Sequence, residues 1–238
     1  MILPFKTFAA LVTAASVVFG SWSYALPGQD PAGVLLLVNR QNRAPSAQPI
    51  LVMPHVPPTK EAYAQNLYMR PEAAAALEAL FAAALEDGHT LYATSGYRSY
   101  ATQDAIFKRR SEALGEKRAS RIVAPPGYSE HQTGLAMDIE GESTLGDGLE
   151  ESFGASPEGI WVAENAHRFG FIIRYKREWE AITGYAYEPW HIRYVGVAHA
   201  TAIARMDVPL ETYLERLRAQ RAQAAGMQAQ KEGEVDEG

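Results

Sequence analysis

Hydrophobic residues between positions 71 and 87 recur at the three- and four-residue spacing of one helix face. They are Leu77, Leu80, Phe81, Ala84 and Leu85. Pro71 stands in the first turn, where its missing N–H costs nothing, and Gly88 follows the last apolar position. The pattern therefore predicts a helix over this segment.

Four more helices are predicted from similar patterns. We expect them at residues 100–114, at 157–169, from just after 195 to about 206, and from 209 onward. Ser99 is a typical N-cap for the first of these four, and Gly115 is a typical end. Gly170 ends the second in the same way.

Four short segments have the pattern of β-strands, at residues 90–94, 135–139, 171–175 and 190–195. In the second, Leu135, Met137 and Ile139 alternate with Ala136 and Asp138, so Asp138 is expected to point away from the apolar side. Short strands beside unevenly spaced helices predict an α+β fold, in which helices flank a small antiparallel sheet.

The two ends of the chain differ from the middle in composition. Residues 1–25 are predicted to be a secretory signal peptide, because Lys6 precedes an apolar run and Ser23 and Ala25 suit a cleavage site. An uncleaved membrane anchor is the alternative, but the run is shorter than the roughly 20 apolar residues that span a bilayer. We therefore expect an exported protein of the periplasm or cell envelope, with no stable membrane span after cleavage.

Three further segments complete the predicted organisation. Residues 26–58, rich in Pro, Gly, Gln and Asn, are expected to lie extended over the core. Residues 59–218 are predicted to form the folded domain, and residues 219–238 a disordered tail without an apolar face. The acidic, Gly-rich residues 140–156 are expected to be a long loop that acts as a rim or lid.

Composition restricts the chemistry. The chain has no cysteine, so any metal site has to use histidine and carboxylate ligands. Its formal net charge is −6, and no Lys/Arg cluster suited to phosphate binding is present, which argues against nucleic acid as a partner. With 47% hydrophobic residues, the chain can bury a full core.

Two segments bring together the residue types of a catalytic zinc site. His131 and Asp138 lie in the segment from Tyr128 to Ile139, and Glu188 and His191 lie further along. Two imidazoles and one carboxylate are three protein ligands, which leaves a coordination position for water, and Glu188 supplies a general base. Because Pro189 disfavours a regular strand, Glu188 is expected in a turn that directs it toward the metal.

A single histidine is more often a hydrogen-bonded structural residue than a ligand. The histidines assigned this structural role are His55, His89, His167 and His199. Arg98 has two interpretations: its guanidinium holds a substrate oxygen, or it forms an ion pair with Asp104 or Glu130. Gln103 and Ser129 are polar neighbours that could bind a carboxylate, although such residues are often caps or turn residues.

Three motifs together resemble a known family. They are S-G-Y-R-S-Y-x-x-Q (residues 95–103), S-x-H-x-x-G-x-A-x-D (residues 129–138) and E-P-W-H-x-R-Y (residues 188–194). In this order and spacing they resemble the signature blocks of the VanY-type D-alanyl-D-alanine carboxypeptidases. These belong to a wider group of zinc peptidases that includes D-Ala-D-Ala dipeptidases and the N-terminal Hedgehog domain. The resemblance covers residues 35–217.

The resemblance implies a fold of the Hedgehog/D-Ala-D-Ala peptidase type, with Zn²⁺ as cofactor. It implies that the zinc ligands are His131, Asp138 and His191. Glu188 matches the catalytic base and Arg98 the arginine that contacts the substrate near the scissile bond. Gln103 and Ser129 match positions around the carboxylate of the terminal D-alanine.

The expected function is therefore removal of the terminal D-alanine from peptidoglycan stem peptides. Two alternatives use the same site: an L,D-carboxypeptidase and a D-Ala-D-Ala dipeptidase. A non-catalytic peptidoglycan-binding module is a further alternative, but the complete ligand set and the intact Glu188 argue against it.

Overall fold

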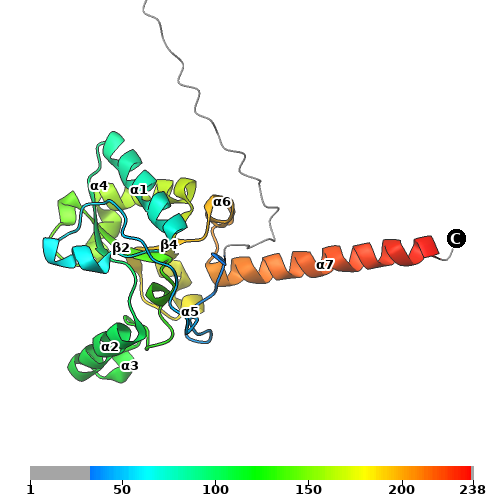
Figure 1. Ribbon diagram of the computed structural model, residues 1–238, viewed down its shortest axis with the longest axis horizontal. Coiled ribbons are helices and arrows are strands. Elements are labelled where there is room, and N and C mark those ends of the chain that lie inside the picture. Colours follow the sequence, from blue (N-terminus) through cyan, green and yellow to red (C-terminus); the bar gives the residue numbers. More distant parts are fainter. Residues whose placement is uncertain (1–32, 237–238) are drawn as a thin grey trace, which may run out of the picture.

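A four-stranded antiparallel sheet lies at the centre of the fold, in the strand order β1-β2-β4-β3. The structure is a computed structural model that describes residues 33–236 (Figure 1). The predicted signal peptide, residues 1–25, lies outside the described residues. The strands are β1 (Leu91–Ser95), β2 (Ala136–Gly141), β3 (Phe171–Tyr175) and β4 (Glu188–Tyr194).

Helices surround this sheet, which confirms the predicted α+β fold. The α-helices are α1 (Pro71–Glu86), α2 (Tyr100–Leu114), α3 (Glu116–Ala119), α4 (Pro157–Asn165), α5 (Glu180–Thr183), α6 (Val197–Met206) and α7 (Leu210–Asp236). The 3-10 helices are η1 (Glu61–Asn66), η2 (Glu130–Thr133), η3 (Glu142–Thr144), η4 (Glu151–Ala155), η5 (Ala166–Phe169) and η6 (Arg177–Trp179).

Helix α2 has the predicted bounds, because its two ends are specified locally. The Ser99 hydroxyl accepts a hydrogen bond from the Thr102 N–H at 3.1 Å, and Gly115 forms the C-cap with a φ of 79°. The helix predicted at 157–169 is present in two parts, because α4 ends at Asn165 and η5 continues to Phe169. The predicted cap signals therefore hold, although the last turn is wound more tightly.

The main hydrophobic core lies between the sheet, α1 and α4. Met137 and Ile139 of β2 are fully buried in it, together with Leu77 and Leu80 of α1. Asp138 lies between the two apolar residues of β2 and so faces the other side of the sheet, as the alternation predicts. A second core contains Leu35, Ile172 of β3 and buried apolar residues of α6 and α7, among them Leu214.

Helix α7 extends away from the rest of the molecule (Figure 1). Its first two turns are packed, with Leu210, Leu214 and Leu217 buried, whereas residues 218–226 are all exposed. The sequence predicts a disordered tail over 219–238, but the structure continues the helix to Asp236. Alanine and glutamine are the commonest residues of this segment, and their high helix propensity accounts for a helix that has no apolar face.

The other irregular segments lie against the domain. Val34, Leu35 and Val38 are buried, so the segment at residues 33–58 covers part of the core. The expected loop at 140–156 includes the end of β2 and the short helices η3 and η4. Among the described residues, no helix has the length and apolarity needed to cross a membrane.

Candidate metal centre and active site

A short helical turn places His131. Helix η2 ends at Thr133 and is capped by Gly134, which has a φ of 70° in the left-handed region. A Cβ at this position would lie 2.9 Å from the Leu51 side chain and 3.2 Å from the Arg70 backbone nitrogen. Glycine is therefore required for the chain to leave His131 and enter β2 directly.

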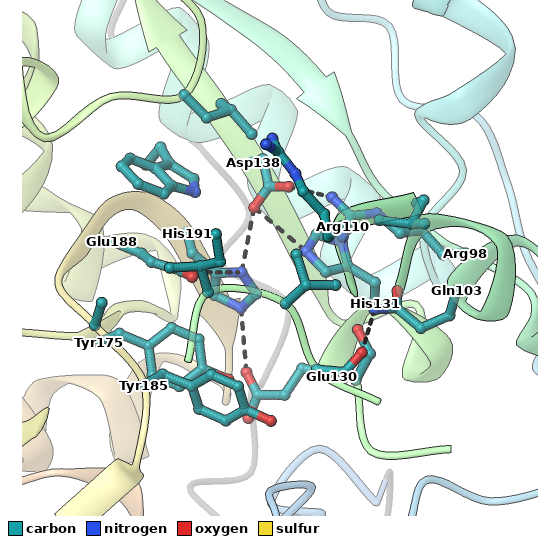
Figure 2. Close-up of a pocket in the computed structure, with 18 of the residues that line it drawn as sticks. Arg98, Gln103, Arg110, Glu130, His131, Asp138, Tyr175, Tyr185, Glu188 and His191 are labelled. Atoms are coloured by element: carbon teal, nitrogen blue, oxygen red, sulfur yellow. Dashed lines mark hydrogen bonds and ion pairs between the residues drawn. The ribbon is translucent and has the colours of Figure 1, made fainter. Parts of the chain in front are cut away.

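Strand pairing places the other two predicted ligands. Asp138 of β2 lies directly opposite His191 of β4 in the antiparallel register. Oδ1 of Asp138 lies 3.3 Å from Nε2 of His131 and 3.2 Å from Nδ1 of His191 (Figure 2). One ligand atom from each residue falls within 4.8 Å of the others, and all three residues are buried.

The donor set fits a metal ion. Oδ1 of Asp138 is buried and accepts no hydrogen bond from the described residues. A buried polar atom without a partner is costly, and this one faces two imidazole nitrogens. One carboxylate oxygen and two imidazole nitrogens are the ligands of a catalytic zinc site.

In both histidine rings, the nitrogen that faces away from Asp138 lies next to a hydrogen-bond acceptor. Nδ1 of His131 lies 2.7 Å from the Gly96 carbonyl oxygen, and Nε2 of His191 lies 3.3 Å from Oε2 of Glu130. When each ring donates its proton to these acceptors, its other nitrogen presents a lone pair toward Asp138. A Cβ on Gly96 would lie 2.6 Å from the Tyr68 carbonyl oxygen. Only glycine therefore fits at this position, where its own carbonyl oxygen meets Nδ1 of His131.

Arg98 holds the second oxygen of Asp138. Its Nη2 donates to Oδ2 at 2.5 Å, and its Nε donates to the Ser95 hydroxyl at 2.9 Å. The surface ion pair with Asp104 or Glu130, which the sequence left open, is therefore not formed. Burial alone would raise the pKa of Asp138, but its interaction with His131 and the positive charge of Arg98 hold that pKa well below its usual range.

Glu188 lies next to His191. Its Oε2 is 3.9 Å from Nδ1 of His191, and burial raises its pKa to about 8. The sequence placed Glu188 in a turn before the strand, but the structure makes it the first residue of β4. Ile173 pairs with Ile192 and Tyr175 with Glu188, so β4 advances four positions while β3 advances two. This bulge accommodates Pro189 and turns Glu188 toward His191.

A cavity of about 430 Å³ opens in front of these residues. Arg98, Gln103 and Ser129 line it together with the candidate ligands and Glu188. The Gln103 side chain is fully buried, and its Nε2 donates to the Ala124 carbonyl at 2.8 Å. The structure thus brings together all the residues that the sequence selected.

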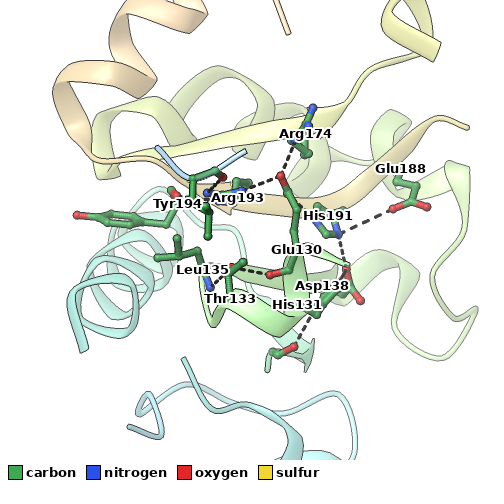
Figure 3. Close-up of polar contacts among 12 residues, drawn as sticks. Glu130, His131, Thr133, Leu135, Asp138, Arg174, Glu188, His191, Arg193 and Tyr194 are labelled. Carbon is green, nitrogen blue, oxygen red and sulfur yellow. Dashed lines mark hydrogen bonds and ion pairs between the residues drawn. The ribbon is translucent and has the colours of Figure 1, made fainter. Parts of the chain in front are cut away.

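No role was predicted for a buried group of charges next to the site. Glu130 lies between Arg174 and Arg193, and both arginines are fully buried (Figure 3). Burial alone would raise the pKa of Glu130, but the two arginines lower it below its usual range. Burial would lower the pKa of His191, but the nearby carboxylates of Asp138 and Glu130 raise it to about 9 while no metal is bound. An arginine inside each of two apolar strands was the sequence signal for this group.

The VanY family profile, described as D-alanyl-D-alanine carboxypeptidase, matches residues 66–197, which is more than half of the chain. The chain belongs to the VanY family. A curated relative, the putative carboxypeptidase YodJ of Bacillus subtilis, is 48% identical over 192 residues. That match covers 80% of this chain and 70% of the relative.

Two solved structures support the family and the fold. The LdcB LD-carboxypeptidase is 48% identical, with a TM-score of 0.73 over 79% of this chain and 88% of that chain. A variant of the vancomycin-resistance D,D-pentapeptidase VanY, in complex with Zn(II), is 34% identical, with a TM-score of 0.64. This match covers 76% of this chain and 98% of that one. The VanY-family chain described here is thus a metallo-carboxypeptidase with zinc as its cofactor, and His131, Asp138 and His191 form a group that fits the ion.

Proposed function

We propose that this protein removes the C-terminal D-alanine from peptidoglycan stem peptides, with zinc held by His131, Asp138 and His191. The observation that carries the proposal is Oδ1 of Asp138, which accepts no hydrogen bond from residues 33–236 and lies between two imidazole nitrogens in the lining of a cavity. Glu188 lies beside this point. These are the parts that amide hydrolysis needs: a metal site, a base and space for a peptide end.

Glu188 acts as the general base and then as the general acid. A zinc ion, when bound, polarises the scissile carbonyl and lowers the pKa of water. Glu188 takes the proton from the attacking water and passes it to the amine of the departing D-alanine. A cation near His191 favours the ionised form of Glu188, which opposes the effect of burial on its pKa.

Arg98 stabilises the negative charge that develops on the carbonyl oxygen. Its Nη2 and Nε are bonded to Asp138 and Ser95, which fixes the plane of the guanidinium at the cavity wall. A donor held in position before the reaction stabilises developing charge without the cost of reorganisation. Gln103 and Ser129, in the same wall, bind the carboxylate of the terminal D-alanine.

The site is compatible with two cleavage reactions, which differ in the residue before the scissile bond. The sequence motifs and the family description favour a D,D-carboxypeptidase, which cleaves a bond preceded by D-alanine. A specific observation favours an L,D-carboxypeptidase: the LdcB neighbour is more similar in sequence and structure than the D,D-pentapeptidase. Tyr175 and Tyr185, which line the cavity beside His191, contact this preceding residue.

A peptidoglycan substrate agrees with the exported, cell-envelope location that the N-terminal residues predict. The dipeptidase alternative asks the same cavity to accept a free N-terminal amine in place of a longer peptide. Free D-Ala-D-Ala therefore serves as a third substrate in the test below.

The deciding experiment measures D-alanine release from synthetic muropeptides that end in D-Ala-D-Ala or in a single D-Ala. Chelator-sensitive release from the pentapeptide alone supports the D,D reaction, and release from the tetrapeptide alone supports the L,D reaction. Turnover of the free dipeptide alone supports the dipeptidase. No release from any of them by the zinc-loaded protein contradicts the proposed function.

A further inference from the structure

Glu130 makes its contacts in two opposite directions. Its Oε1 accepts hydrogen bonds from Nε of Arg174 at 2.8 Å and from Nη1 of Arg193 at 2.7 Å. Its Oε2 faces Nε2 of His191 at 3.3 Å (Figure 3). Because two rigid guanidinium groups occupy one oxygen, the carboxylate cannot rotate freely, and the other oxygen stays directed at the imidazole.

Both arginines are themselves held in place. Glu211, near the start of α7, receives two hydrogen bonds from Arg174, at 2.9 and 2.6 Å. Nη2 of Arg193 donates to the carbonyl oxygens of Val34 and Leu36, at 2.9 and 2.8 Å. The buried cluster therefore joins α7 and the N-terminal segment to the back of the metal site.

The charges in this cluster balance. Arg174 and Arg193 carry two positive charges, and Glu130 and Glu211 carry two negative charges; all four residues are buried. Such a cluster is expensive to desolvate, and packed apolar residues often give equal or greater stability. Its position is more informative: it ends on the imidazole nitrogen that faces away from Asp138. Residues that hydrogen-bond a metal-ligating histidine from behind orient the ring and raise its basicity.

We propose that Glu130 is a positioning residue for His191, and that the cluster of Arg174, Arg193 and Glu211 holds it in that position. Glu130 keeps Nδ1 of His191 directed at the zinc site, so the packing of α7 contributes to zinc affinity. This inference rests on the zinc site proposed above and concerns how tightly that site binds.

The test measures zinc affinity by competition with a chromophoric chelator, in parallel with the thermal stability of the metal-free protein. Glu130→Gln is expected to weaken zinc binding about 10- to 100-fold. Glu211→Gln, one step further from the histidine, is expected to give a smaller loss in the same direction. The visible absorption spectrum of the cobalt-substituted protein is expected to change in Glu130→Gln, because the direction of the His191 ligand changes.

Glu158→Gln is the matched control. Glu158 is also a buried carboxylate, but it accepts hydrogen bonds from Ser143, away from the metal site. This variant is expected to keep wild-type zinc affinity and the wild-type cobalt spectrum, whatever its effect on stability. A structural role alone would make both substitutions act on stability and neither on metal binding.

Glu130→Gln leaves two buried arginines with one counter-ion and so endangers folding. The double variant Glu130→Gln with Arg193→Gln keeps the charges balanced, since the pair of Arg174 and Glu211 remains. The double variant is expected to show the same weakening of zinc binding. Unchanged zinc affinity in the folded single variant, or in the double variant if the single one does not fold, overturns the inference. Failure of the wild-type protein to bind zinc would instead contradict the proposed function.

Discussion

Two buried carboxylates lie next to each other in this protein and have opposite surroundings. Oδ1 of Asp138 has no hydrogen-bond partner among the described residues and faces two imidazole nitrogens. Both oxygens of Glu130 are occupied, one by two arginines and the other by His191. Oδ1 of Asp138 is therefore available to a ligand, whereas the carboxylate of Glu130 holds His191 in position.

The energetic consequences differ accordingly. A buried acceptor without a partner costs about 1–3 kcal/mol, so metal binding at Asp138 removes a cost that is already present in the fold. Removal of a partner from the satisfied cluster around Glu130 creates such a cost. Substitutions near Asp138 should therefore affect metal and activity, and substitutions in the cluster should affect stability as well.

The largest effect is expected from His131→Ala. Loss of one of three ligands should abolish zinc binding and D-alanine release, while the metal-free fold is kept because the arginine cluster is intact. Elemental analysis of the purified variant measures the first effect. His55→Ala, at an exposed position, is the control and should keep both zinc and activity. Stoichiometric zinc in His131→Ala would remove this residue from the ligand set.

Glu188→Ala is expected to separate chemistry from metal binding. The zinc content should match that of the wild type, while kcat falls by about 10²- to 10⁴-fold, the usual contribution of a general base. Glu178→Ala, an exposed glutamate on η6, should leave kcat unchanged. Wild-type turnover in the Glu188 variant would exclude it as the base.

Arg174→Ala should destabilise the fold more than substitutions of the residues around Asp138. It leaves Glu130 and Glu211 buried with one cation fewer, which costs about 3–5 kcal/mol in the free energy of unfolding. Arg177→Ala, three positions on, removes an exposed pair with Glu151 and should have little effect. Urea denaturation of the metal-free proteins compares the two. Equal free energies of unfolding for the two variants would show that the buried cluster does not stabilise the fold.

The smallest effect is expected from truncation after Arg218. The residues that follow, up to position 226, are exposed along α7, whereas Leu210, Leu214 and Leu217 keep the packed part of the helix in place. The melting temperature and kcat/KM should stay at their wild-type values. A drop in the melting temperature would mean that the distal part of α7 packs on the domain in solution.

Local signals account for the elements that the sequence predicted well. Ser99 and Gly115 cap α2 through their own backbone and hydroxyl groups, so its bounds did not depend on tertiary contacts. The alternation in β2 places Asp138 on the opposite face from Met137 and Ile139, and this placement also needs no tertiary contact. The bounds of the terminal segments, including the signal peptide, remain predictions.

Other features had no local signal. The bulge that makes Glu188 part of β4 depends on how β3 pairs with it, and Pro189 by itself pointed to a turn. Helix α7 beyond residue 218 has helix-forming residues but no apolar face, and the absence of that face suggested disorder. Glu130 was considered only as a partner for Arg98, because its position beside His131 does not reveal the arginines.

The sequence by itself determined the kind of site: two histidines, two carboxylates and an arginine, in motifs whose residue types suit zinc and amide hydrolysis. Only the tertiary structure decided which nitrogen of each ring faces Asp138 and which carboxylate supports His191. Those contacts join residues between 35 and 63 positions apart in the chain. They depend on strand register and on the packing of buried charges, and neither leaves a periodic pattern in the sequence.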